Sequence, residues 1–112
     1  MGTNQRYPYL GMKRLEEREL QAARRAGPLQ TLTSVQLRLH ERVVSVVPEG
    51  MQVWGHAWLR FGHVDVRCTV LVRRWTSDAV GVEVPVDDGE KLQCWIWQGA
   101  CERLAERTDA WV

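Results

Sequence analysis

The strict alternation of apolar and polar residues between positions 53 and 72 constrains the fold more than any other feature of this chain. One phase holds the small or apolar residues Val53, Gly55, Ala57, Leu59 and Phe61. After Gly62 and His63 the same phase resumes with Val64, Val66, Cys68, Val70 and Val72. A period of two is typical of strands that bury one face, and glycine at the first of two central positions favours a type II′ turn. The pattern predicts a hairpin with the pairs Phe61–Val64, Leu59–Val66, Ala57–Cys68 and Val53–Val72.

A second hairpin is predicted around the sequence Asp87-Asp88-Gly89, which suits a three-residue loop with glycine in the left-handed region. Before this loop the apolar residues alternate as Val80, Val82, Val84 and Val86. The loop then sets the apolar pairs Val84–Leu92, Val82–Cys94 and Val80–Ile96. On the other face Trp95 falls opposite Gly81, and Trp97 opposite Ala79. An indole that covers a cross-strand glycine offsets the weakness of glycine in a sheet, so these two tryptophans have a structural explanation.

The segment from Leu29 to Val47 fits two patterns. Val35, Leu37 and Leu39 alternate as in a strand, whereas a helical stripe joins Leu32, Val35, Leu39, Val43 and Val46. The β-branched residues of 43–47 favour a strand there, which would be the fifth. We therefore expect a mainly β (α+β) domain: a small, partly open antiparallel barrel of four to five strands, SH3-like or OB-like.

The flanking segments complete the predicted organisation. Good helix formers from Met12 to Ala26 precede Gly27 and Pro28, which predicts a helix with a narrow apolar stripe of Met12, Leu15, Ala22, Ala23 and Ala26, and with Leu20 to one side. We expect an irregular arm over 1–11 and a short helix or turn over 98–106. The predicted division is 1–28 for the arm and helix, 29–107 for the β domain and 108–112 for a tail.

Composition excludes several classes of protein. Apolar residues make up 45% of the 112 residues and charged residues 26%, which is ordinary for one globular domain. Apolar runs fall far short of the roughly 20 residues that span a bilayer, so we expect a cytoplasmic protein without membrane contact. Three cysteines without CxxC spacing predict neither a disulfide framework nor a metal site. Because Cys68 and Cys94 lie in the inward phase, they are poor nucleophiles, and we expect neither enzymatic activity nor a cofactor.

Four tryptophans, Trp54, Trp58, Trp95 and Trp97, are out of phase with the apolar set and should lie opposite the core. With nearby arginines they define a candidate binding surface of Trp54, Trp58, Arg60, Arg67, Arg73, Arg74 and Trp75. The first hairpin sets Trp58 opposite Arg67, close enough for a cation–π contact. Tryptophan interleaved with arginine is typical of single-stranded nucleic-acid binding and of protein–protein hot spots. We therefore predict a non-enzymatic module that binds nucleic acid, with another protein or self-association as the alternative.

A weaker pattern involves two separate segments. Arg38 to Arg42 forms RxxxR, and Thr76 to Gly81 reads TSDAVG before an alternating strand. This resembles the PilZ pattern of RxxxR followed by (D/N)xSxxG on a small barrel. The resemblance implies a cyclic dinucleotide held by Arg38 and Arg42. Thr76 stands where the family has Asp or Asn, and Asp78 where it has Ser.

Overall fold

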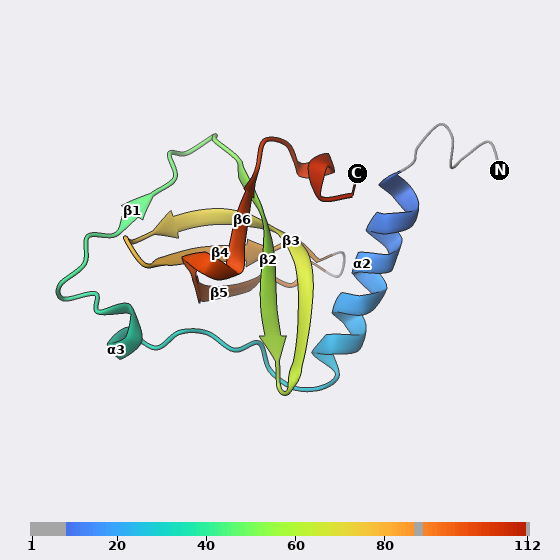
Figure 1. The fold of residues 1–112 in the computed structure, drawn as a ribbon, viewed down its shortest axis with the longest axis horizontal. Coiled ribbons are helices and arrows are strands. Elements are labelled where there is room, and N and C mark those ends of the chain that lie inside the picture. Colours follow the sequence, from blue (N-terminus) through green and yellow to red (C-terminus); the bar gives the residue numbers. More distant parts are fainter. Residues whose placement is uncertain (1–8, 87–88, 112) are drawn as a thin grey trace.

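A computed structural model describes residues 9–86 and 89–111, which form a six-stranded antiparallel sheet with a helix, α2 (Tyr9–Arg24), beside it (Figure 1). The strand order is β5 (Leu92–Trp97), β4 (Ala79–Val84), β3 (Val64–Trp75), β2 (Val53–Phe61) and β6 (Cys101–Leu104). A two-residue strand, β1 (Ser45–Val46), pairs with the end of β3. Within the described ranges the outer strands β5 and β6 do not pair, so the sheet is open. The mainly β fold with an N-terminal helix is confirmed, but the strand number is six rather than four to five. The barrel and its SH3-like or OB-like identity stay predictions.

Both predicted hairpins form in the predicted register. Phe61 pairs with Val64 and Val53 with Val72 in the first, and Val84 pairs with Leu92 in the second. Gly62 has a φ of 58°, as expected for the first position of its turn. Gly89 has a φ of 78°, whereas Asp87 and Asp88 of the predicted loop lie outside the described residues.

The core lies between the inner face of the curved sheet and α2. Its buried strand residues are Ala57, Leu59, Phe61, Val66, Cys68, Val70, Val72, Val82, Val84, Cys94 and Ile96. The helix adds Leu20 and Ala23, whereas Met12 and Leu15 are exposed. The predicted stripe is therefore wrong in its centre: the helix packs through Leu20, which the stripe placed to one side.

Hydrogen bonds to the neighbouring strand explain this rotation of α2. The Glu16 carboxylate accepts hydrogen bonds from the backbone N–H and the hydroxyl of Thr69, the latter at 3.1 Å. An ion pair between Arg24 and Glu90 ties the end of the helix to the β4–β5 hairpin. Because Glu16 and Leu20 are one turn apart, the face that binds the strand must also bury Leu20. The helix begins at Tyr9, so 9–11 are not part of an arm, and the rest of the predicted arm lies outside the described residues.

The segment that fitted two patterns adopts neither over most of its length. It contains one helical turn, α3 (Ser34–Leu37), which is capped by Thr33 and ends at Arg38 with a left-handed φ of 53°. The strand predicted over 43–47 is reduced to the two residues of β1. Many of the apolar side chains here are exposed, so no packing energy selects one of the two periodicities.

The start of this segment joins the two sides of the open sheet. Gln30 donates its backbone N–H to the Arg60 carbonyl on β2, at 2.8 Å. Two residues later Leu32 donates to the Trp95 carbonyl on β5, at 3.0 Å, and Trp95 donates to the Thr31 hydroxyl, at 2.8 Å. The chain from Leu29 to Leu32 therefore holds β2 and the outer edge of β5 together.

The helix or turn predicted over 98–106 is largely wrong. A 3₁₀ turn, η1 (Gln98–Ala100), leads into β6, which pairs with β2. A free strand edge presents a row of unpaired backbone groups that a strand can satisfy and a short helix cannot. A second 3₁₀ helix, η2 (Arg107–Trp111), follows where a tail was predicted, and it contacts α2 and β2. No helix in the described part of the chain is long and apolar enough to cross a membrane.

Candidate functional site

The outer surface of the β2–β3 hairpin carries the first part of the predicted binding surface. Trp58 is exposed there, at 53% of its surface. The Arg60 guanidinium forms an ion pair with Asp65, at 3.2 Å, and Arg67 forms one with Glu102 of β6, at 3.1 Å. The predicted cation–π contact of Arg67 with Trp58 is therefore absent, although the two residues are cross-strand partners. Both arginines of this surface are already neutralised.

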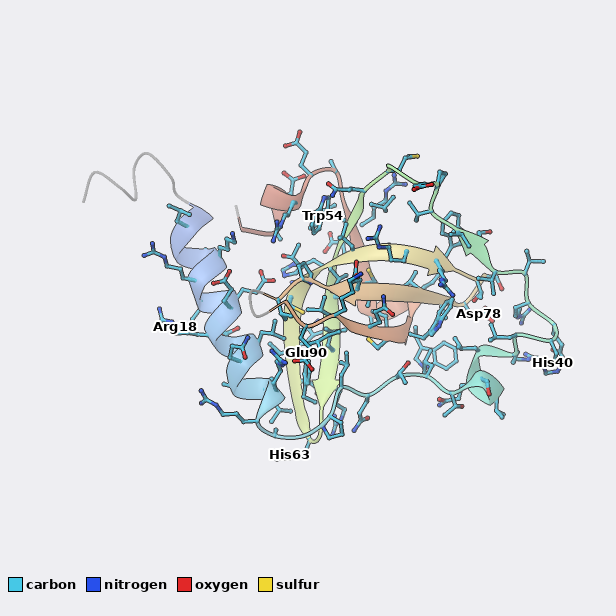
Figure 2. All side chains as sticks on the ribbon, turned by 180° about the vertical axis from the view of Figure 1, so that it is seen from behind. Arg18, His40, Trp54, His63, Asp78 and Glu90 are labelled. Carbon is cyan, nitrogen blue, oxygen red and sulfur yellow. The ribbon has the colours of Figure 1, made fainter. Side chains whose placement is uncertain are left out.

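Trp54 is covered by the protein itself. The guanidinium of Arg107, on η2, lies 4.8 Å from the centroid of the Trp54 ring. Figure 2 shows Trp54 on the side of the sheet where the C-terminal segment returns. A cation above an indole is a favourable structural contact, and it leaves this ring half-buried. Trp54 is thus part of the packing between β2 and η2.

A β-bulge separates the remaining predicted residues from this surface. Val72 pairs with Val82 of β4, but Arg74 pairs with Gly81, so Arg73 is an extra residue in β3. The bulge reverses the phase of the strand end. Arg74 consequently shares the outer face with Gly81, whereas Trp75 falls opposite Val80 of the inner face.

The outer face beyond the bulge contains a hollow of about 490 Å³. Its lining includes Thr31, Arg73, Arg74, Glu83, Lys91, Gln93 and Trp95. Arg73 forms an ion pair with Glu83, at 3.0 Å, whereas Arg74 and Lys91 form no ion pair with any other described residue. The hollow thus combines two available cations with an indole.

Trp95 is held firmly in this hollow. It pairs with Gly81 as predicted, and a β-carbon placed on Gly81 would lie 3.3 Å from the indole. The ring therefore packs flat on the glycine backbone. Lys91 and Gln93 were missed by the sequence reasoning. The signal was available, because Gln93 in β5 and Lys91 just before the strand share the odd-numbered phase of Trp95.

The structure brings together the two segments that resemble the PilZ pattern. Arg42 Nε lies 3.1 Å from Asp78 Oδ2, and Figure 2 shows Asp78 at the same end of the molecule as His40. The Arg38 guanidinium pairs with Glu41. Thr76 has a structural role, because its hydroxyl accepts hydrogen bonds from the backbone N–H groups of residues 78 and 79. Arg38 and Arg42 are thus both already paired with carboxylates.

The three thiols are poorly suited to nucleophilic chemistry. Burial raises the pKa of Cys68 and Cys101, and raises the pKa of Cys94 to about 11. Since the thiolate is the nucleophile, these shifts suppress reactivity near neutral pH. Burial, followed by the positive charge of Arg67, lowers the pKa of His56. No cluster of three metal-ligating side chains occurs in the part of the chain that the structure describes.

No family model, curated protein or solved structure matches this chain.

Proposed function

We propose that this protein is a non-enzymatic binding module that takes up single-stranded nucleic acid in the hollow on the outer face of β3, β4 and β5. The observation that carries the proposal is the placement of Arg74 and Lys91, neither of them ion-paired within the described residues, around the indole of Trp95. The β2–β3 surface contributes less, because its arginines are neutralised by Asp65 and Glu102.

The chemistry of the hollow suits a base with its flanking phosphates. An indole stacks on any base and contributes about 1–3 kcal/mol per base, while cations meet the phosphates. The volume of about 490 Å³ is that of a small-molecule site and is large enough for a nucleotide. Glu83 fixes the guanidinium of Arg73, and Gly81 fixes the ring of Trp95, so the hollow loses little side-chain entropy on binding.

The test is the binding of a fluorescently labelled single-stranded oligonucleotide, followed by anisotropy at low and moderate salt. We expect affinity that falls with salt. We also expect Arg74→Ala with Lys91→Ala to reduce the slope of log affinity against log salt by about 0.7 for each lost phosphate contact. Trp95→Leu should weaken binding at both salt concentrations with little change in slope. This result is expected because stacking is not an ionic contact.

Arg60→Ala is the matched control, because it removes an exposed arginine that is already paired with Asp65. It should leave affinity within about twofold, as expected for a surface ion pair of small net value. Absence of binding at protein concentrations well above micromolar would refute the proposal. A loss of affinity in the control, with none in the Arg74/Lys91 variant, would also refute it and would move the site back to the β2–β3 surface.

A second candidate is the binding of a cyclic dinucleotide, favoured by the contact between Arg42 and Asp78 that joins the two PilZ-like segments. Asp78 would compete with a phosphate for this guanidinium. Asp78→Ser removes the competing carboxylate and restores the residue of the family pattern, so it should tighten binding in a calorimetric titration. Arg42→Ala should abolish binding. If neither the natural chain nor Asp78→Ser binds, this candidate fails, whatever the outcome for oligonucleotides.

A further inference from the structure

We infer that the end of the molecule remote from α2 is an interface between two copies of this chain. Figure 1 shows α3 and β1 at this end, with α2 on the opposite side of the sheet. Eight of the eleven exposed large apolar side chains in the described residues belong to it: Val35, Leu39, Val43, Val44, Val46, Met51, Trp75 and Trp97. We call this set the apolar end. Val35 and Val43 are 81% and 83% exposed, which is unusual for a soluble monomer when such residues are grouped.

Contacts within the chain place six of these eight residues in one region. Ser45 pairs with Trp75, which places Val44 and Val46 beside the end of β3. Met51 and Trp75 line the same hollow. Gln98 donates its backbone N–H to the Asp78 carbonyl, at 2.9 Å, and Asp78 forms the ion pair with Arg42. Trp97 and Val43 are the chain neighbours of these bonded residues, so they lie on the same end.

The charges at this end favour a second copy as the partner. Arg38 is paired with Glu41, His40 lies 3.2 Å from the same carboxylate, and Arg42 is paired with Asp78. In a twofold interface a surface meets itself, so any unpaired charge near the axis would meet its like. The segment 38–42 pairs all of its charges within the same copy, so it can lie near the axis without this repulsion.

The apolar end also contains a hollow that a second copy can fill. We call the segment 34–46, which carries α3 and β1, the projecting segment. Beside it lies a hollow of about 520 Å³, lined by the apolar residues Val47, Met51, Val53, Val72, Trp75 and Val80 and by the polar residues Gln98 and Arg103. In a twofold interface residue i of one copy contacts residue j of the other, and j contacts i. The projecting segment of each copy can therefore enter the hollow of its partner, and both contacts form at once.

The size of the set is adequate for a stable contact. A standard interface buries about 800 Å² on each partner. Trp75 and Trp97 are 40% and 46% exposed, so each supplies somewhat less than half of the about 150–250 Å² that an aromatic side chain can bury. Five aliphatic side chains and one methionine add to this, so the exposed apolar area is of the order that a dimer interface requires. Association would also remove the highly exposed Val35 and Val43 from water.

The test is sedimentation velocity of the whole protein over a wide concentration range. We expect a dimer that dissociates on dilution. Val43→Asp with Leu39→Asp should convert it to a monomer, because each copy would bury two uncompensated carboxylates. Leu15→Asp on α2 is the matched control, since Leu15 and Leu39 are both 42% exposed. The control should remain dimeric.

Circular dichroism spectra and urea midpoints check that the variants are folded, which is expected because the substituted side chains are exposed. A natural chain that is monomeric throughout the concentration range overturns the inference and assigns the apolar end to a different protein. A dimer that survives Val43→Asp with Leu39→Asp overturns it as well. These outcomes can be told apart from a failure of nucleic-acid binding, because the substituted Leu39 and Val43 do not line the hollow that carries Arg74 and Lys91.

Discussion

Gly62→Ala should destabilise the protein far more than its position in an exposed hairpin turn suggests. Gly62 has a φ of 58°, and a residue with a β-carbon pays about 1–2 kcal/mol in this region. The larger effect comes from the chain that crosses the turn. A β-carbon on Gly62 would lie 2.4 Å from the carbonyl oxygen of Ala26, a backbone atom that cannot rotate away. The connection after α2 must therefore move.

The movement would break hydrogen bonds that hold the connection to the hairpin. Gly62 donates its backbone N–H to Pro28 at 3.1 Å, and its carbonyl accepts from the Gln30 side chain at 2.8 Å. The backbone N–H of Gln30 donates to Arg60, also at 2.8 Å. Each such bond contributes about 1 kcal/mol net, so losing two of them adds about 2 kcal/mol. We expect a total loss of about 3–4 kcal/mol, a large share of the stability of a small domain.

Urea unfolding measures this loss, and Gly50→Ala provides the control. Gly50 also has a positive φ, of 85°, but a β-carbon there would meet nothing within 4 Å. Gly50→Ala should therefore lose only the stability that follows from its positive φ, about 1–2 kcal/mol. Equal losses of stability in the two variants would refute the reasoning, because the contact between the connection and the hairpin turn would then contribute nothing.

Three further predictions concern His56, Cys94 and the helix contact. Burial, followed by the positive charge of Arg67, lowers the pKa of His56, so protonation is less favourable in the folded state than in the unfolded chain. Stability should therefore fall as pH drops below about 6.5, and His56→Gln should flatten this dependence in urea titrations. Burial raises the pKa of Cys94 to about 11, so the neutral thiol contributes fully to the free energy of unfolding below about pH 9. Above that pH the contribution is lost, by up to about 1.4 kcal/mol per pH unit, and Cys94→Ala should lose less stability in alkaline solution. Glu16→Ala leaves the N–H and hydroxyl of Thr69 without their acceptor and should cost about 1.5–3 kcal/mol by thermal or urea unfolding.

The hairpins could be predicted because their information is local. In the first, a period of two and one turn glycine fix every pair from Phe61–Val64 outward, and a slip of one residue would expose the whole apolar set. In the second, the three-residue loop predicted the register that sets Trp95 opposite Gly81, where the indole packs on the glycine. Short-range patterns of this kind determine structure whenever one face is buried.

The segment from Leu29 to Val47 could not be predicted, because its structure depends on distant residues. Leu32 donates to Trp95, and Val47 donates its backbone N–H to Arg73, at 2.9 Å. Neither partner is near in sequence, and the exposed valines between them give a periodicity without burial. The same holds for β6, which is a strand because β2 offers a free edge. Where apolar residues such as Val35 and Val43 are exposed in the chain, their spacing does not distinguish a helix from a strand.

The candidate site shows how one residue can redirect a surface. Extending the alternation of β3 beyond Val72 places Arg73 on the outer face and Arg74 on the inner one. The bulge at Arg73 moves Arg74 to the outer face as well, and sets it against Gly81 and Trp95. Burying the charged Arg74 guanidinium on the inner face would be costly. The extra residue places it on the outer face instead, with only one irregular pair in the strand. Three consecutive polar or bulky residues at a strand end, Arg73, Arg74 and Trp75, are therefore a sign that the alternation must break. The cations of the hollow follow from that break, and the arginines before it remain in ion pairs.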